Sequence, residues 1–233
     1  MVRHYVLVLT SSLARQAEYW QLNAPSQRLM YTQKNWQLPV GARIYLDLET
    51  TGLEGDNSIV EVSAEYRSNG VKVTKFNAKG YDSTAKVNLE ALRVNKHNFK
   101  SLGALRSEQE LLMGLFDWIL GLNTKSADLA GINIQFDYNL LKQRAEKYNI
   151  IVGSVLPYRL HDISNISRFL TKIGLLNIKN SGPGNSLKDL ADALGIQYDE
   201  KDLHTASGDV GLYYPVDSKL EELAIQAMCK CKV

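Results

Sequence analysis

RIYLDLETTGLEG, residues 43–55, has the pattern of a buried β-strand that carries two acidic side chains. Apolar residues alternate with Tyr45, Asp47 and Glu49, and because successive strand residues face opposite sides of a sheet, both acids point the same way. Two carboxylates roughly 5 Å apart, at an effective dielectric of roughly 20, repel by about 3 kcal/mol. Either water solvates the pair at an exposed edge, or a cation lies between the two acids.

The size and composition of the chain fit a globular protein. Its 233 residues suffice for one large α/β domain, or for one domain with an appendage. Hydrophobic residues make up 45% and charged residues 22%, which can support a full core, and the net charge of +2 does not by itself indicate nucleic-acid binding. No apolar run approaches the roughly 20 residues that span a bilayer, so no membrane association is expected.

The cysteines and the first residues bear on the expected location. Cys229 and Cys231 are separated by a single residue, which suits neither a disulfide nor a zinc site. This predicts a reduced tail in an intracellular, cytoplasmic protein. The opening MVRHYVLVLTSSLA mimics a short secretory signal, but its apolar segment is shorter than usual and fits a β-strand better.

Residues 1–42 form an extension that is both basic and aromatic. They carry four basic side chains against the single acid Glu18, together with five tyrosine and tryptophan residues. The pattern predicts a strand at 5–10 and a helix at 13–22. Two alternatives stay open: the aromatic side chains pack on the sheet, or the extension adds a surface for nucleic acid or a protein partner.

The stretch that follows predicts an antiparallel meander. Strands are expected at 44–48, 59–66 and 71–77. Asn69-Gly70 between the second and third is a strong signal for a tight hairpin turn, so these two strands should run antiparallel.

The rest of the chain alternates helix and strand patterns. The expected elements are helices at 108–120, 138–149, 187–194 and 205–214, and strands at 129–133 and 158–163. A hairpin followed by such alternation predicts one α/β domain with a mixed sheet. We place this domain at 43–215, with a C-terminal helix and tail at 216–233.

Three further candidate site residues lie at the ends of expected elements. Asp137 lies where the strand 129–133 hands over to a helix, and His204 and Asp209 lie near the start of the last predicted helix. Ligands collect at such ends in α/β sheets. Each signal alone has an ordinary alternative, since a lone Asp at such a junction is usually a helix cap.

In this order, the motifs resemble the DEDDh family of 3′→5′ exonucleases, which includes polymerase proofreading subunits. The matching positions are Asp47-Leu48-Glu49-Thr50-Thr51-Gly52-Leu53 in the first motif, Gly131, Asn133, Phe136 and Asp137 in the second, and His204, Ala206 and Asp209 in the third. The resemblance covers about residues 43–214. Where many relatives carry a His-Gly-Ile-Thr-like stretch, this chain has Asn95-Lys96, which leaves the catalytic set intact.

The resemblance implies a ribonuclease H-like fold: an antiparallel meander, then parallel strands, with helices on both faces. It also implies two divalent cations, Mg²⁺ or Mn²⁺, which suit oxygen ligands and can stabilise an in-line phosphoryl displacement. By family role, Asp47 contacts both ions, Glu49 and Asp209 hold the one on the nucleophile side, and Asp137 holds the other. His204 takes the proton from the attacking water.

The resemblance also implies how the substrate end is held. In the family the turn of Thr50, Thr51 and Leu53 contacts the terminal nucleotide, with Asn133 and Phe136 on the second motif. The implied function is a metal-dependent 3′→5′ exonuclease acting on a single-stranded or frayed 3′ end and releasing nucleoside 5′-monophosphates. The alternative is a non-cleaving module that holds nucleic acid or tethers a partner. DNA or RNA as substrate, and a polymerase or other protein as partner, both stay open.

Overall fold

The computed structural model describes residues 41–122, 124, 126–153, 155–178 and 186–230. All of them belong to the compact unit Pro39–Val233. The expected strand and helix of the N-terminal extension, and Cys231, lie outside the described residues.

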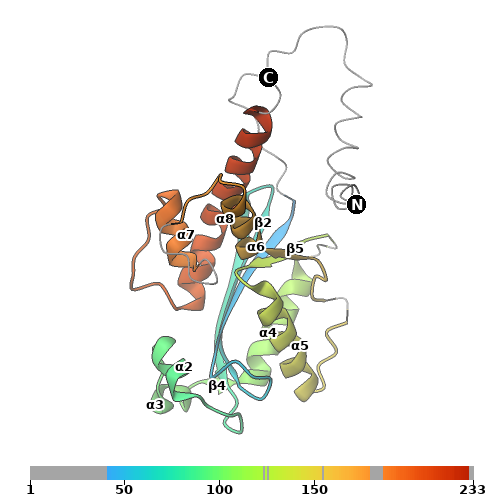
Figure 1. Cartoon of the computed structure of the whole chain (residues 1–233). Coiled ribbons are helices and arrows are strands. Elements are labelled where there is room, and N and C mark those ends of the chain that lie inside the picture. Colours follow the sequence, from blue (N-terminus) through green and yellow to red (C-terminus); the bar gives the residue numbers. More distant parts are fainter. Residues whose placement is uncertain (1–40, 123, 125, 154, 179–185, 231–233) are drawn as a thin grey trace, which may run out of the picture. The chain divides into compact units, whose positions relative to one another are not determined.

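The described residues build a six-stranded mixed sheet (Figure 1). Its strands are β1 Arg43–Thr50, β2 Ile59–Ser68, β3 Val71–Tyr81, β4 Arg106–Ser107, β5 Asp128–Gly131 and β6 Leu160–Asp162, in the order β4-β3-β2-β1-β5-β6. β1, β2 and β3 are antiparallel neighbours, whereas β5 runs parallel to β1 and β6 runs parallel to β5. The prediction of an antiparallel meander followed by parallel strands is confirmed.

The turn between β2 and β3 has the chemistry that the sequence predicts. Asn69 and Gly70 have φ values of 50° and 78°, the left-handed conformations that a tight hairpin turn requires. The register then pairs Glu61 with Lys79 and Ser63 with Asn77. Because Glu49 and Asp47 on β1 face these same β2 residues, polar side chains run in rows across one face of the sheet.

β3 is an outer strand for most of its length. Among the described residues, only Gly80 and Tyr81 pair outwards, with β4. Lys72, Lys75 and Lys79 are spaced along the part of β3 for which the described residues provide no outer neighbour.

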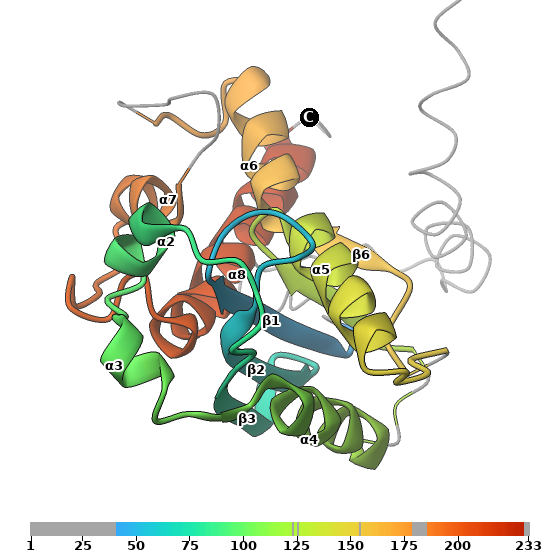
Figure 2. The same ribbon diagram turned by 90° about the horizontal axis from the view of Figure 1, so that it is seen from below.

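One face of the sheet is covered by α4 Glu108–Gly121 and α5 Ile134–Lys147 (Figure 2). Ile44, Leu46 and Leu48 of β1 lie in this core together with leucines of both helices. α4 begins at a capping box, in which Ser107 accepts from the Glu110 amide and Glu110 reaches back to Ser107.

The opposite face carries α6 Ile163–Lys172, α7 Leu187–Leu194 and α8 Ala206–Lys230. α7 starts after Ser186 and ends at Gly195, whose φ of 67° suits a left-handed helix terminus. α8 continues through Pro215 to Lys230, so the helix expected to end at Tyr214 and the segment 216–230 are one element. None of the helices in the described ranges is long and apolar enough to cross a membrane.

Two short helices, α2 Leu89–Val94 and α3 Phe99–Leu102, lie beside the end of β1. They were not predicted, because four to six residues show too little periodicity. Their asparagine caps, Asn88 and Asn98, fix where they begin, and Leu92 and Leu102 anchor them against Val60 of β2.

A buried ion network joins α4, α5 and the loop after β3. Arg144 of α5 is 2% exposed and donates to both carboxylate oxygens of Glu108 and, at 2.6 Å, to Asp82. Glu108 also accepts from the Ile59 amide at 2.6 Å and from the Tyr148 hydroxyl at 2.8 Å. Burial opposes ionisation of Asp82, but Lys147, Thr84 and Arg144 outweigh it and hold the pKa of Asp82 below its ordinary value.

Candidate metal centre

Three of the predicted acids converge at the C-terminal end of β1. Asp47 and Glu49 share one face of that strand, and Asp209 lies in the first turn of α8, which packs on this face. One carboxylate oxygen from each of the three lies within 4.8 Å of the others. Strand alternation places the first two acids, and the helix brings the third from more than 150 residues later in the sequence.

Asp137 joins this group from α5. Because β5 runs parallel to β1, the chain leaves β5 at the same edge of the sheet, and Asp137 follows in the first turn of α5. Gly131 permits this close approach, since a Cβ there would lie 2.8 Å from the Leu46 carbonyl oxygen. The strand expected to reach Asn133 ends at Gly131, and the helix cap is Asn133, with φ 54°, and not Asp137.

The electrostatics of the four carboxylates oppose their ionisation. Burial, and then the charges of Asp137 and Asp209, raise the pKa of Asp47 well above its ordinary value. Burial also raises the pKa of Asp137, against the opposing effect of nearby backbone amides. Burial and the charge of Asp209 raise the pKa of Glu49 to about 7, and burial raises the pKa of Asp209 to about 6.

The donor set fits divalent cations. All four groups are carboxylates, the ligand type that Mg²⁺ and Mn²⁺ prefer. Their pKa values are raised mainly by burial and, for Asp47 and Glu49, also by the neighbouring carboxylates, and the charge of a bound cation would oppose both effects. The centre therefore has the chemistry of a cation site.

Tyr213 is a site residue that the sequence motifs did not reveal. It is buried in α8, and its hydroxyl donates to Asp47 Oδ1. Burial and the charge of Asp47 raise the pKa of Tyr213 well above its ordinary value, so it acts as a neutral donor. Its position four residues after Asp209, on the same helical face, is the signal that could have found it.

His204 lies at the rim of the centre and outside the group of converging oxygens. Its side chain is exposed, and its backbone N–H donates to Asp209 Oδ1 at 3.3 Å. Its φ of 59° is left-handed, which turns the chain sharply just before α8. Burial raises the pKa of Asp209, and the charge of His204 counteracts this effect, so the imidazole is within electrostatic reach of that carboxylate.

The five residues expected at the substrate end differ in accessibility. Leu53 is 81% exposed, and Asn133 is exposed at the start of α5. Thr50 and Thr51 are buried, and the Thr51 hydroxyl donates to the Lys86 carbonyl while accepting from the Ser58 amide. Phe136 is partly buried against the core. Leu53 and Asn133 are therefore free for contact, whereas Thr51 holds the turn in shape.

A second group of potential ligands consists of His161 on β6 and of Asp217 and Glu221 further along α8. The Arg43 guanidinium donates to Asp217 at 2.8 Å and to Glu221 at 2.7 Å, where a cation would otherwise neutralise them. His161 and the Tyr45 hydroxyl each contact Asp217 at 2.8 Å. Burial opposes ionisation of Asp217, but His161 and Arg43 outweigh it and hold its pKa below the ordinary value. This cluster is a buried structural network.

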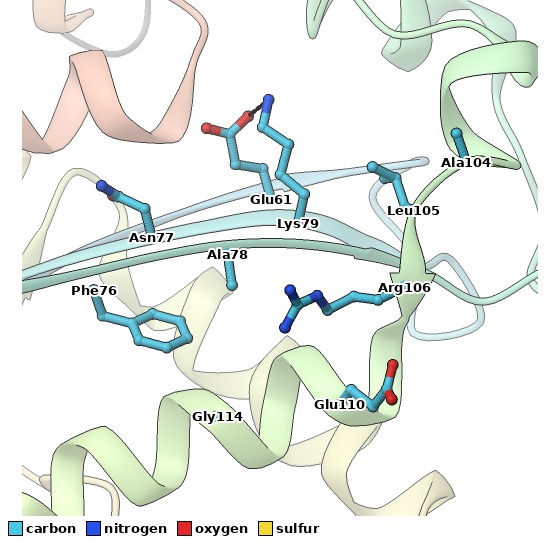
Figure 3. A pocket seen from close by; sticks show the side chains of 10 residues that line it. All are labelled: Glu61, Phe76, Asn77, Ala78, Lys79, Ala104, Leu105, Arg106, Glu110 and Gly114. Atoms are coloured by element: carbon cyan, nitrogen blue, oxygen red, sulfur yellow. Dashed lines mark ion pairs between the residues drawn. The ribbon is translucent and has the colours of Figure 1, made fainter.

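A groove of about 530 Å³ lies at the edge of β3 (Figure 3). Phe76, Arg106 and Glu110 line it on the α4 side of the strands, and Glu61 pairs with Lys79 at 2.9 Å on the opposite face of these strands. None of the four converging acids lines it. The groove adjoins the row of polar side chains in which Glu61 lies beside Glu49. It does not include the carboxylates of the candidate metal centre.

The order and directions of the strands define the class of fold: it is a ribonuclease H-like fold, which solved structures of exonucleases share. Similar solved structures include exonuclease I from Methylocaldum szegediense (TM-score 0.62, 16% identity, 77% of this chain and 40% of the other) and E. coli exonuclease I in complex with a dT13 oligonucleotide (0.63, 13%, 78% and 41%). Cell-death related nuclease 4, CRN-4, is also similar (0.63, 10%, 79% and 65%).

This likeness is one of fold. The chain spans about two fifths of the exonuclease I chains and about two thirds of CRN-4. No protein-family model matches the sequence. No curated protein matches it either.

Proposed function

We propose that this chain is a member of the DEDDh family and a metal-dependent 3′→5′ exonuclease that releases nucleoside 5′-monophosphates from a single-stranded or frayed end. The observation that carries the proposal is the convergence of Asp47, Glu49 and Asp209 within 4.8 Å on a ribonuclease H-like fold. The charge of Asp137 acts on Asp47, and the backbone N–H of His204 donates to Asp209, which supports adding these two residues to the proposed site.

Two divalent cations, Mg²⁺ or Mn²⁺, are the proposed cofactors. Asp47, Glu49 and Asp209 would hold one, and Asp137, whose charge acts on Asp47, would share the second with Asp47. When bound, such a pair stabilises charge on the attacking and leaving oxygens of a phosphodiester. The raised pKa values support this assignment, because the protons that the carboxylates retain are those a cation would displace.

The proposed role of His204 is to accept a proton from the attacking water through a ring nitrogen. Its side chain is exposed at the rim, and its backbone bond to Asp209 fixes its distance from the acids. Proton transfer by a positioned group typically contributes about 10²–10⁴-fold to a rate.

The substrate end would bind between the turn after β1 and the start of α5. Leu53 offers an exposed apolar side chain for a terminal base, and Asn133 offers an amide on the opposite element. Thr50 and Thr51 shape the turn, and Phe136 supports the helix start. Similar structures of E. coli exonuclease I contain dT13 and 5cy-dA13 oligonucleotides, which supports a single-stranded substrate here.

The test is degradation of matched 5′-labelled DNA and RNA oligonucleotides with Mg²⁺, with Mn²⁺ and with chelator. A ladder of shortening products that requires metal, and that a blocked 3′ end prevents, is the expected result. Binding without cleavage under every metal condition would favour the non-cleaving module. Release of the 5′ nucleotide first, or cleavage of a closed circle, would contradict the exonuclease assignment.

A further inference from the structure

Asn95 and Lys96, at the end of α2, contact two chain segments that flank the candidate metal centre. Asn95 Nδ2 donates to the Thr50 carbonyl at 2.9 Å, one residue after Glu49. Lys96 Nζ donates to the carbonyls of Lys201 and Leu203, both at 2.9 Å. Two consecutive residues thus link the end of β1 to the segment that leads into His204.

The backbone of Lys96 is unusual for a lysine. Its φ is 58°, and it directly follows the helix cap, a position where glycine is favoured because it has no Cβ. The His97 amide donates to the Leu92 carbonyl at 2.9 Å, which closes the helix around this conformation. Glycine would adopt this left-handed conformation at a lower energetic cost, so the end of the helix by itself does not explain a lysine at this position.

The side chain of Lys96 supplies what glycine could not. Leu203 immediately precedes His204, which is also left-handed, with φ 59°. The ammonium donates two of its three N–H groups to carbonyls of the segment that leads into His204. Burial raises the pKa of Glu49 and of Asp209, and the positive charge of Lys96 lowers both values. The amine therefore lies within electrostatic reach of these acids.

We propose that Lys96 is a positioning residue, which with Asn95 holds the His204 segment at a fixed place relative to the turn after Glu49. The inference rests on the proposed nuclease function for its kinetic consequence, but not for its structural one. Misplacing a catalytic group by about 1 Å can cost roughly 100-fold in rate, so a loose His204 segment would lower kcat.

The kinetic test compares Lys96→Gly and Lys96→Met with wild type, with Lys100→Met as the matched control. Lys96→Gly removes the side chain while suiting the left-handed backbone, so the fold should survive. Lys100 is exposed on α3, with no hydrogen bond or ion pair assigned to it among the described residues. We expect kcat to fall roughly 10–100-fold in both Lys96 variants, with KM within about threefold and Lys100→Met unchanged.

A phosphate contact is the competing role for Lys96, and it would behave differently. Loss of a phosphate contact raises KM, and reduces the slope of log affinity against log salt by about 1. Such a result, with kcat unchanged, would overturn the positioning role.

The contacts of Asn95 and Lys96 that hold the His204 segment are here called the clamp. Hydrogen exchange of the full chain tests this clamp without measuring nuclease activity. Lys96→Gly should increase amide exchange in residues 199–209, whereas Lys100→Met should not. Unchanged exchange in this segment would overturn the proposal even in an active enzyme. If the wild type cleaved no oligonucleotide but the exchange result held, the proposed function would fail while the clamp would stand.

Discussion

Asp47 lies among the other three carboxylates of the metal centre, whose charges all act on it. Burial is the main cause of its raised pKa, followed by the charges of Asp137 and Asp209. A buried carboxylate beside like charges costs the protein stability, and a cation bound at the proposed centre would offset this cost.

The first prediction concerns Asp47→Asn. Asparagine keeps an acceptor for the Tyr213 hydroxyl but removes the charge. Cleavage should fall by more than about 100-fold, the usual cost of losing a preorganised electrostatic group. The melting temperature in chelator should be unchanged or higher, because a repelling charge is gone. Cleavage near the wild-type rate would show that Asp47 lies outside the active centre.

The second prediction separates His204 from the metal ligands. His204→Gly and His204→Asn both suit a left-handed backbone, so neither should strain the turn. Each should lower the rate by about 10²–10⁴-fold while leaving Mg²⁺ affinity, measured by calorimetry, nearly unchanged. If either variant lost metal affinity as severely as Asp209→Ala, His204 would be a ligand and not the base.

At the scale of secondary-structure elements, the Arg144 network fixes α4 and α5 against the sheet. Glu108 is fully buried and receives donors from Arg144, Ile59 and Tyr148. Removing one partner of a buried ion pair leaves an uncompensated charge, which is more costly than the pair is stabilising.

The third prediction is that Arg144→Met lowers the free energy of unfolding at pH 7 by about 3–5 kcal/mol. The exposed Arg168→Met is the matched control and should change it by less than about 0.5 kcal/mol. Urea titrations at several pH values extend the test. The Asp82 pKa is lower folded than unfolded, so its contribution is present above roughly pH 4 and is lost in stronger acid. The difference in the free energy of unfolding between wild type and Arg144→Met should therefore become smaller as the pH falls. A difference that does not depend on pH would argue against the network.

The elements differ in how well the sequence predicts them. The β2–β3 hairpin was predicted because Asn69-Gly70 and the alternating residues on both sides agree. β4, α2 and α3 were missed, since elements of two to six residues carry little periodicity and depend on tertiary contacts. The sequence predicts a helix that ends near Tyr214, before Pro215, but α8 continues through this proline to Lys230.

The sequence predicts more of the candidate site residues than of the residues that surround them. Asp47, Glu49, Asp137 and Asp209 belong to short motifs, and their carboxylates lie near one another in the structure, whereas His204 lies at the rim; their roles stay predictions. Tyr213 had a local signal in its position four residues after Asp209, but the contacts of Lys96 could not be predicted, because a long-range pair such as Lys96 with Leu203 leaves no local pattern. Their partners become visible only once the chain is folded.

At the scale of the whole molecule, the metal centre and the Arg144 network respond to pH in different ranges. The carboxylates of the centre hold protons in the folded state that the unfolded chain releases above roughly pH 4. In chelator, stability should therefore fall as the pH rises towards about 7, the pKa of Glu49, whose share is on the order of 3 kcal/mol.

The fourth prediction follows for melting temperature in chelator between pH 5 and pH 8. It should decrease with rising pH, and saturating Mg²⁺ should reverse much of the decrease, because cation binding is favoured once the protons have left. Asp47→Asn should show a shallower decrease than wild type. A melting temperature in chelator that rose over this range would contradict the electrostatic account of the centre.

The outer strand β3 has a consequence for how the protein behaves at high concentration. A long strand with unpaired amides and carbonyls is a template on which another molecule can add a strand, and so begin an aggregate. Lys72, Lys75 and Lys79 are spaced along this edge, and the first and third are paired with Glu65 and Glu61 of β2. A second copy approaching edge to edge would bring like charges together. These lysines therefore oppose edge-to-edge association of two copies, and they favour a protein that does not aggregate in concentrated solution.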